Sequence, residues 1–152
     1  MYFYPYTDYP YTDYRNNYER EKNIVFYDGV CNFCNGFVIF LLEHEWKNNM
    51  LFCSLQSEFA ASFLKDFNVQ VNLETIYYYS NGEVYQRSEA IKNISRNLKP
   101  PYLMVFYFLA ITPKFIREYF YKLFAKNRYK WFGKKDKCQI PSSEERLRFL
   151  DF

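Results

Sequence analysis

Histidine is almost absent from this sequence, and patterns of metal ligands are sparse. The single histidine, His44, lies ten residues after Cys34, which is about 15 Å along one continuous helix. It can therefore neither act as the base for a cysteine nucleophile nor share a metal ion with Cys34, which argues against a Cys–His hydrolase. Cys53 and Cys138 are solitary, and there is no second C-x-x-C, so we expect no bound metal, zinc included.

Long apolar runs and strong charge are also lacking. The longest apolar run, residues 102–111, is about half the length of a membrane-spanning helix. The net charge of +3 is too small on its own to indicate nucleic acid or membrane partners. The first residues show no basic stretch followed by an apolar one, which predicts no signal peptide and a cytoplasmic protein. Thiols stay mostly reduced there, so a close cysteine pair is more often catalytic or metal-binding than structural.

Aromatic residues are abundant instead. They make up 24% of the 152 residues and hydrophobic residues make up 49%, enough for one domain with a sizeable core. Residues 1–22 stand apart, because the pentapeptide Pro-Tyr-Thr-Asp-Tyr occurs twice in succession, at 5–9 and 10–14. We predict that 1–22 form a disordered tail, or alternatively an aromatic arm that contacts a partner, and that 23–152 form a single domain.

The most informative feature is the pair Cys31 and Cys34. The sequence predicts a buried strand before them, over 24–27, and a helix after them, over about 32–46. A C-x-x-C pair where a strand meets a helix is typical of a thioredoxin-like redox site. A cysteine in the first helical turn faces unpaired backbone N–H groups and the positive end of the helix dipole, which stabilise its thiolate. The second cysteine, one turn on, is close enough to form a disulfide with the first.

The rest of the pattern completes a β-α-β-α-β-β-α order. Further strands are predicted at 50–55, 75–79 and 84–85, and helices at 57–67 and 88–98. Ser57 is expected to cap its helix, Asn81-Gly82 predicts a type I′ hairpin, and the last helix stops before Pro100. This is the element order of the thioredoxin fold in its glutaredoxin-like form, so the predicted fold class is α/β, thioredoxin-like.

A helical C-terminal extension is predicted from about residue 101. Thr112 and Pro113 are expected to be the N-cap and first residue of another helix. Its predicted apolar stripe comprises Ile116, Tyr119, Phe120, Leu123 and Phe124. The segment 114–137 is distinctly basic. Either the helix covers the core and presents a solvated face, or the segment docks an acidic partner or makes a peripheral contact with an anionic membrane surface.

Cys31 is predicted to be the nucleophile, since it is nearer the strand end and the exposed helix terminus. Cys34, a turn deeper, is predicted to be the resolving thiol. The Cys31 thiolate would attack a substrate disulfide, and Cys34 would then attack Cys31 and release the reduced substrate. In the opposite direction, the Cys31–Cys34 disulfide would oxidise a dithiol substrate. The alternative is a pair of buried structural cysteines.

Three further residues, an aspartate and two cysteines, can be interpreted from their sequence context. Asp28 is either a turn residue that bonds local N–H groups, or a carboxylate that accepts or returns a proton as Cys34 reacts. Cys53 alternates with large apolar residues, which favours a buried, inert thiol. Cys138 follows a basic run that would favour its thiolate, so a third redox thiol is the alternative to no role.

These residues resemble a known family. The run from Tyr27 to Cys34, with its D-x-x-C-x-x-C, is similar to the signature of the DCC-type thiol-disulfide oxidoreductase family. The segments 87–91 and 127–133, the latter followed by Cys138, match that family's pattern as well, and the resemblance covers roughly 23–150. It implies a thioredoxin-like fold, an oxidoreductase role, and motif positions for Asp28, Cys31 and Cys34.

The resemblance also bears on ligands. Ser88-Glu89-Ala90-Ile91 looks like the Ser-x-Ala-Ile turn with which glutathione-binding thioredoxin relatives hold a carboxylate at a helix N-terminus. Ser88 and Glu89 are therefore weak candidates for substrate binding, the alternative being an ordinary helix cap. Thioredoxins also place a cis-proline before the third strand, whereas this chain has Leu73-Glu74-Thr75 there, so we expect substrate pairing at that edge to differ.

The sequence thus favours a thiol-disulfide oxidoreductase, similar to protein-disulfide reductases, acting through a redox-active C-x-x-C dithiol. No tightly bound cofactor is expected, and glutathione or a protein dithiol would be the redox partner. The alternative is a non-catalytic thioredoxin-like interaction module that uses the basic aromatic C-terminal region. No nucleic acid partner is expected.

Overall fold

The structure is a computed structural model that describes residues 23–47, 49–133 and 148–150. The predicted tail 1–22 and Cys138 lie outside the described residues. The element order is β1 (Asn23–Tyr27), α2 (Asn32–His44), β2 (Met50–Ser54), α3 (Glu58–Asp66), β3 (Tyr77–Ser80), β4 (Glu83–Gln86), α4 (Arg87–Ser95), α5 (Met104–Ile111) and α6 (Lys114–Phe132).

The four strands form one sheet in the order β2-β1-β3-β4. β1 runs parallel to β2 and antiparallel to β3, so Ile24 pairs with both Leu51 and Tyr79. β4 adds the antiparallel edge next to β3. The connection from β1 through α2 to β2 is the parallel crossover that the sequence predicts. The order confirms the predicted thioredoxin-like α/β fold with a helical C-terminal extension.

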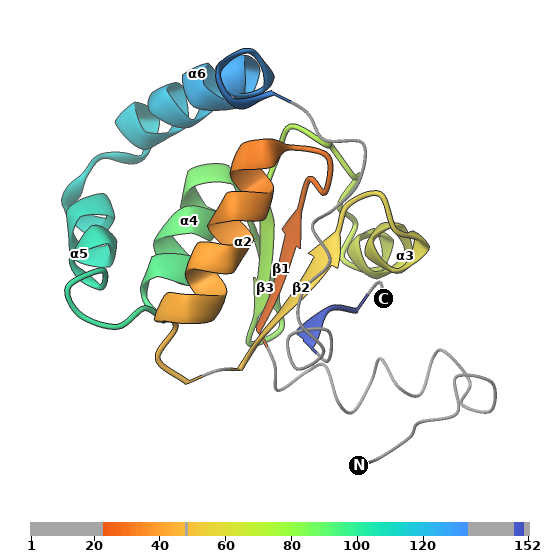
Figure 1. Cartoon of the computed structure of the whole chain (residues 1–152), viewed down its shortest axis with the longest axis horizontal. Coiled ribbons are helices and arrows are strands. Elements are labelled where there is room, and N and C mark those ends of the chain that lie inside the picture. Colours follow the sequence, from red (N-terminus) through yellow and green to blue (C-terminus); the bar gives the residue numbers. More distant parts are fainter. Residues whose placement is uncertain (1–22, 48, 134–147, 151–152) are drawn as a thin grey trace.

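Helices cover both faces of the sheet, α2 and α4 on one and α3 on the other (Figure 1). Alternate strand residues face the two sides. Val25 and Tyr27 of β1 pack with Val38 and Leu41 of α2. On the other side, Ile24 and Phe26 belong to a cluster that includes residues of α3 such as Phe63 and Leu64. The C-x-x-C helix therefore begins from the fully packed central strand.

Local signals set several boundaries as predicted. The Ser57 hydroxyl accepts a hydrogen bond from the Ala60 N–H at 3.2 Å, which caps α3. Asn81 and Gly82 have φ angles of 52° and 84°, the left-handed pair that a type I′ hairpin needs between β3 and β4.

The C-terminal extension differs from the prediction. Residues 104–111 form their own helix, α5, and Thr112 ends it with a hydroxyl that donates to the Phe108 carbonyl, so Pro113 rather than Thr112 is the N-cap of α6. Only part of the predicted apolar stripe of α6 faces inward, because Ile116 and Phe124 are half-buried. Tyr119, Phe120 and Leu123 are exposed, and the buried residues of α6 are two arginines, Arg117 and Arg128.

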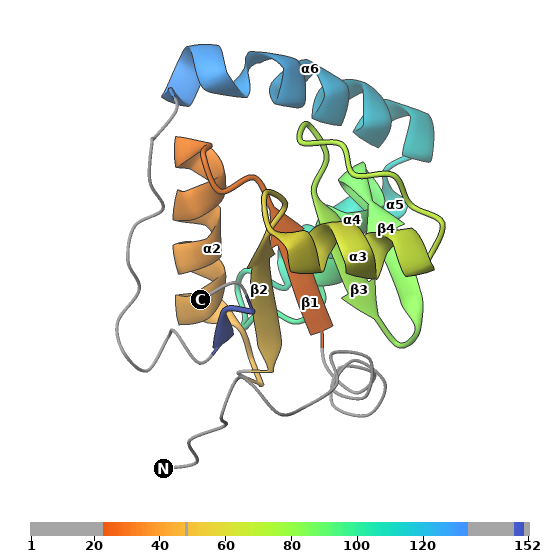
Figure 2. The ribbon, with the colours of Figure 1, turned by 90° about the vertical axis from the view of Figure 1, so that its right-hand side faces the viewer.

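α6 lies across the end of the molecule at which α2 begins (Figure 2). Its last turn is joined to the first turn of α2, because the Asn32 side chain donates to the Phe132 carbonyl at 2.7 Å and the Asn32 N–H to the Gly133 carbonyl at 3.4 Å. Phe33 packs edge-on against Phe124 in the same region. The extension is thus placed directly over the C-x-x-C turn.

Candidate redox site

The C-x-x-C turn has the geometry of a capped helix start. Cys31 is the N-cap of α2, with extended backbone, and its sulfur accepts from the Cys34 N–H at 3.4 Å. The Cys31 N–H donates to the Asp28 carbonyl at 3.3 Å, which closes the turn after β1. The thiol of Cys31 therefore faces the unpaired N–H groups at a helix N-terminus, as the sequence predicts.

Two amides from outside the motif hold this turn. The Gln56 side chain accepts from the Gly29 N–H at 3.0 Å and donates to Asp28 Oδ1 at 2.6 Å. The buried Asn35 side chain donates to the Gly29 carbonyl at 2.9 Å. Because both sides of the turn are tied, the position of the two cysteines is fixed by the fold and not only by local sequence.

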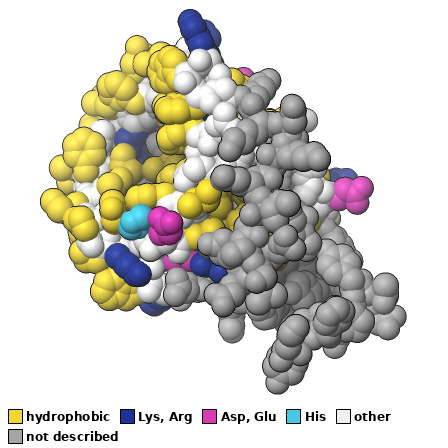
Figure 3. Space-filling view, viewed as in Figure 1, with side chains coloured by type: hydrophobic (Ala, Val, Ile, Leu, Met, Phe, Trp, Pro, Cys, Tyr) yellow, Lys and Arg dark blue, Asp and Glu magenta, His cyan; other side chains and the backbone are white. Residues whose placement is uncertain are grey.

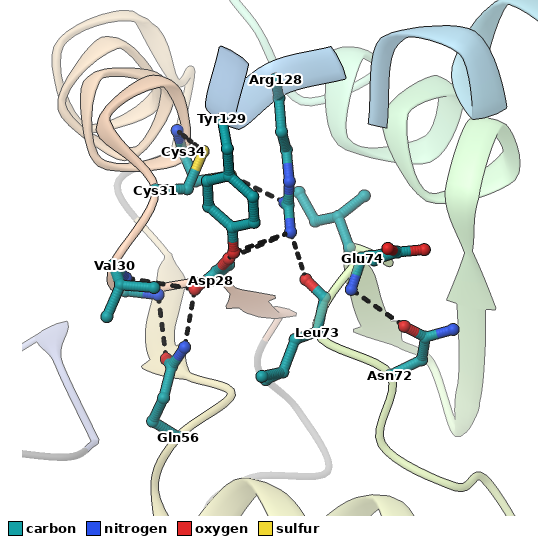
Figure 4. Close-up of polar contacts among 12 residues, drawn as sticks. Asp28, Val30, Cys31, Cys34, Gln56, Asn72, Leu73, Glu74, Arg128 and Tyr129 are labelled. Atoms are coloured by element: carbon teal, nitrogen blue, oxygen red, sulfur yellow. Dashed lines mark hydrogen bonds and ion pairs between the residues drawn. The ribbon is translucent and has the colours of Figure 1, made fainter. Parts of the chain in front are cut away.

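Asp28 is buried and makes contacts with both of its carboxylate oxygens (Figure 4). Oδ1 accepts from the Val30 N–H at 3.1 Å as well as from Gln56, which is the turn role considered for this residue. Oδ2 accepts from Arg128 Nη2 at 3.0 Å and from the Tyr129 hydroxyl. A buried carboxylate requires such partners, since an unpaired one is strongly disfavoured.

Arg128 is the central side chain that sequence reasoning missed. It comes from α6 and is buried, and its Nη1 donates to Cys34 Sγ at 3.3 Å while Nη2 reaches Asp28. The segment 127–133 carries part of the family resemblance, which was the one available signal, but nothing in it indicated a role for the arginine. Arg128 brings a fixed positive charge to the thiol pair.

α6 also contacts the segment before β3, where thioredoxins carry a cis-proline. Arg128 Nη2 donates to the Leu73 carbonyl at 2.5 Å. The Tyr121 hydroxyl accepts from the Ile76 N–H at 2.9 Å and donates to the Glu74 carbonyl at 3.5 Å. Backbone groups at this edge are therefore bound by α6 itself.

The two cysteines differ in exposure, and in the opposite sense to the prediction. Cys31, expected at an exposed helix terminus, has no exposed surface, because the last turn of α6 lies over the start of α2. Cys34, expected to be deeper, is half-buried and lines a cavity. Both are reduced and are not joined by a disulfide.

The pKa values of the two thiols diverge. The pKa of Cys31 is lowered to about 6, first by the hydrogen bond from the Cys34 thiol and then by backbone N–H groups and the charge of Arg128, against the effect of burial. The pKa of Cys34 is raised, because this thiol donates to Cys31, is partly removed from water, and lies beside the Cys31 thiolate. One thiolate shared within the pair therefore resides on Cys31.

The other residues singled out by sequence lie apart from the pair. The Ser88 hydroxyl donates to Glu118 at 2.5 Å, and Glu89 forms ion pairs with Arg117 and Lys92, so both side chains hold α6 onto α4. His44 is at the far end of α2, with Nδ1 2.8 Å from the Phe40 carbonyl. Cys53 is buried in β2, as expected from its apolar neighbours.

The described residues contain no group of three or more His, Cys, Asp or Glu side chains that could hold a metal ion. None of the helices in the described ranges is long and apolar enough to cross a membrane. The chemistry that the site offers is that of a vicinal dithiol with one stabilised thiolate and a buried cation in contact with the second sulfur.

Comparisons with known proteins agree with this geometry. A family model described as DCC1-like thiol-disulfide oxidoreductase matches residues 25–134, which include the end of β1, the C-x-x-C and all of α6. The uncharacterized protein YuxK of Bacillus subtilis is 39% identical over 130 residues, covering 85% of this chain and 94% of YuxK. A chloroplastic DCC family protein of Arabidopsis thaliana is 32% identical over 123 residues, covering 80% of this chain and 72% of the plant protein. No solved structure gives a significant match.

Proposed function

The chain belongs to the DCC1-like thiol-disulfide oxidoreductase family, and from that premise we propose that it exchanges disulfides through Cys31 and Cys34. The observation that carries the proposal is the asymmetry of the pair. The hydrogen bond from Cys34 lowers the pKa of Cys31 to about 6, which makes this sulfur a thiolate at neutral pH. Thiolates are the attacking species in disulfide exchange, and low-pKa thiols are also good leaving groups.

The proposed cycle moves two electrons from the protein to the substrate. The Cys31 thiolate attacks one sulfur of the substrate disulfide, forms a mixed disulfide and expels the other substrate sulfur as a thiolate. Cys34 then loses its proton and attacks the Cys31 sulfur, which forms the Cys31–Cys34 disulfide and releases the second substrate thiolate. The Arg128 guanidinium, 3.3 Å from Cys34 Sγ, would stabilise the negative charge on that sulfur during this step.

Two alternative roles are considered for Asp28 in this cycle. Its contacts with Arg128 and Tyr129 favour that of a counter-ion which positions the guanidinium against Cys34. The second role is that of a carboxylate that takes the Cys34 proton. Asp28→Asn in an Arg128→Met background separates them, because a counter-ion to Arg128 has no further effect on exchange there, whereas loss of a proton acceptor still slows it.

Glutathione or a protein dithiol is the proposed redox partner, with no tightly bound cofactor. A reducing compartment such as the cytoplasm is part of the same proposal, since it would return the dithiol to its reduced form. Ser88 and Glu89 stay weak candidates for binding such a partner. Because Ser88 contacts Glu118 and Glu89 contacts Arg117, a ligand there would have to displace one of these two residues of α6.

The test is a comparison of single cysteine variants in a disulfide-reduction assay. Cys31→Ser should abolish exchange, whereas Cys34→Ser should stop after the first step and accumulate a mixed disulfide visible by mass spectrometry. Cys53→Ser is the matched control, because Cys53 is buried in β2 away from the pair. If Cys31→Ser and Cys34→Ser both reduce substrate as well as the wild type, the proposal fails.

A second candidate function, binding without catalysis, is favoured by the outer face of α5 and α6. No residue of α5 is buried, and Phe108, Ile111, Phe115 and Tyr119 are 65–81% exposed. Hydrophobic side chains dominate this side of the molecule (Figure 3). Large exposed apolar patches mark contact sites, and the exposed lysines on α6 would suit an anionic partner or membrane surface.

Vesicle sedimentation tests this candidate without redox chemistry. Protein lacking both cysteines of the pair should sediment with phosphatidylglycerol vesicles, and salt should weaken the binding. Lys122→Glu with Lys126→Glu should release it, whereas Lys65→Glu, on α3, should not. Sedimentation that is indifferent to these charge reversals would count against an electrostatic contact through α6.

A further inference from the structure

A cavity of about 510 Å³ opens beside Cys34, between α2, α4, α5 and α6. This size is within the range of small-molecule sites. Its wall is almost entirely apolar and includes Phe33, Phe37, Ile91, Leu109, Ile116 and Phe124. Figure 3 shows the hollow on the left side of the molecule, ringed by hydrophobic side chains. Cys34 is the reactive group in this wall, and Cys31 is not part of it.

Most polar groups around the cavity are already used within the protein. The Ser88 hydroxyl donates to Glu118, and the Thr112 hydroxyl donates to the Phe108 carbonyl. The Tyr121 hydroxyl is held between Ile76 and Glu74. A peptide or a strongly polar ligand would therefore find few hydrogen bonds in this wall, which favours a ligand with an apolar body.

Arg117 is the exception. Its side chain is only 7% exposed and lines the cavity, and Nη2 donates to Glu89 at 2.7 Å, but Nε and Nη1 have no hydrogen-bond partner. Buried donors left unpaired are costly, which favours a ligand that supplies acceptor oxygens. Arg117 is fixed in place by the Glu89 contact.

The local charge balance favours an anion rather than a neutral acceptor. Arg117 and Lys92 share one carboxylate, since Lys92 Nζ lies 3.1 Å from the other oxygen of Glu89. The remaining carboxylate nearby, Glu118, is 3.8 Å from Arg87. Three cations thus share two carboxylates next to the cavity, and Arg117 is the one of these five residues that lines it, which favours one more negative charge at Arg117.

The two arginines mark the ends of an elongated site. Arg117 and Arg128 lie on the same face of α6, since eleven residues are about three turns, or about 16 Å along the axis. Arg128 contacts Cys34, so the sulfur end of the cavity is there and the anion end is at Arg117. An extended chain with a sulfur group at one end and an anionic group at the other matches this layout.

We propose that the cavity binds an aliphatic disulfide or dithiol whose chain ends in a carboxylate, with its sulfur atoms at Cys34 and its carboxylate at Arg117. This inference rests on the proposed exchange function and names the class of its reducing partner. In the reducing direction, a ligand thiolate attacks Cys34, the sulfur in the cavity wall, and expels Cys31 as a thiolate, so the ligand regenerates the dithiol with which Cys31 attacks its own substrate. The second ligand thiol then attacks the mixed disulfide, so the ligand loses two electrons and two protons and the protein pair gains them.

The experiment follows reduction of the oxidised protein by dihydrolipoate and by dihydrolipoamide, which have the same thiols and chain but differ in charge at the far end. Quenched alkylation and mass spectrometry give the rate constants. We expect dihydrolipoate to react about tenfold faster than dihydrolipoamide at subsaturating concentration. This is the effect of one hydrogen bond to a charged group. Arg117→Gln should remove the difference. Lys65→Gln, exposed on α3, should keep it.

Ile91→Phe provides a second variant, in case loss of the Arg117–Glu89 contact unfolds α6. It fills the cavity and leaves Arg117 in the sequence, and it should slow dihydrolipoate more than dithiothreitol, which lacks the acid chain. Equal rates for dihydrolipoate and dihydrolipoamide with wild-type protein, or a preference that survives Arg117→Gln, would overturn the proposal.

A failure of the exchange function itself gives a different result, because dithiothreitol would then not reduce the pair either. In that event, calorimetric titration of the Cys31→Ser/Cys34→Ser protein with octanoate and octanamide tests ligand binding in the cavity independently of the redox reaction. Binding of octanoate in preference to octanamide supports the site, and absence of binding overturns it.

Discussion

The Arg128 guanidinium lies 3.3 Å from the Cys34 sulfur and 3.0 Å from the Asp28 carboxylate, although about a hundred residues separate it from both. One buried cation therefore links the first and last positions of the D-x-x-C-x-x-C motif. Its positive charge offsets the effect of the buried Asp28 carboxylate, and it is one of the causes that lower the pKa of Cys31.

Arg128→Met should raise the pKa of Cys31 above about 6. The charge of Arg128 is one of the causes that lower this pKa, and its removal leaves the negative charge of Asp28 uncompensated nearby. A rise of roughly 1 unit or more is expected from the loss of a close opposite charge. Thiolate absorbance at 240 nm against pH measures it. Lys130→Met, exposed on the same helix, is the control, and equal titration curves for the two variants would contradict the assignment.

Asp28→Asn should destabilise the protein by about 3–5 kcal/mol, because Arg128 is then left as a buried charge without its partner. Urea unfolding of the reduced protein gives the free energy. Glu83→Gln, on the exposed hairpin, should change it by less than about 0.5 kcal/mol. In the double variant with Arg128→Met the two losses should be far from additive. Additive losses would show that the pair does not interact as described.

The stability of the reduced protein should depend on pH through Cys31. Its pKa is lowered from 9.0 to about 6 on folding, so the native state binds the proton less tightly than the unfolded state. The resulting stabilisation is fully present above pH 9 and is lost as the pH falls through about 6. The melting temperature of wild type relative to Cys31→Ser should therefore increase from pH 5 to pH 8. A constant difference over this range would exclude the shift.

Gly133→Ala should alter the redox site, whereas Gly82→Ala should not. Both glycines have positive φ angles, 78° and 84°, so both substitutions strain the backbone, and Gly133, with ψ 177°, lies in a region almost restricted to glycine. A Cβ at Gly133 would lie 3.2 Å from Asn32 Nδ2, but one at Gly82 would meet nothing within 4 Å.

In Gly133→Ala we expect the last turn of α6 to cover Cys31 less completely. Alkylation of this cysteine at a pH above its pKa should then be faster. Gly82→Ala, which reports on backbone strain alone, should alkylate at the wild-type rate. If Gly133→Ala alkylates no faster than Gly82→Ala, the last turn of α6 does not control access to Cys31.

The sequence predicts those parts of the fold and the site that depend on residues close together in the chain. β1, the C-x-x-C turn, α2 and the Asn81-Gly82 hairpin each follow from a local pattern, and the structure confirms them. The turn role of Asp28 also follows from local sequence, because its partner Val30 is two residues away. A local pattern is sufficient here since the backbone conformation of each segment depends on its own residues.

The part that could not be predicted depends on which face of α6 turns inward. Helical periodicity shows that Phe120 and Leu123 share an apolar stripe, and the usual rule places such a stripe in the core. Here these side chains are exposed, and Arg128 is buried instead, because Asp28 and Cys34 provide it with partners. The rule failed because a specific buried ion pair determined the orientation, and no local signal identifies that pair.

The long separation between Arg128 and the thiol pair has a consequence for biosynthesis. A ribosome makes Cys31 and Cys34 well before α6, so for about a hundred residues of elongation the nascent motif lacks its arginine and the covering helix. Domains emerge from the N-terminal end first. During that interval Asp28 has no buried cation beside it, and both sulfurs stand open to oxidants. The reactive site is therefore completed only when α6, the last helix of the described residues, has been translated.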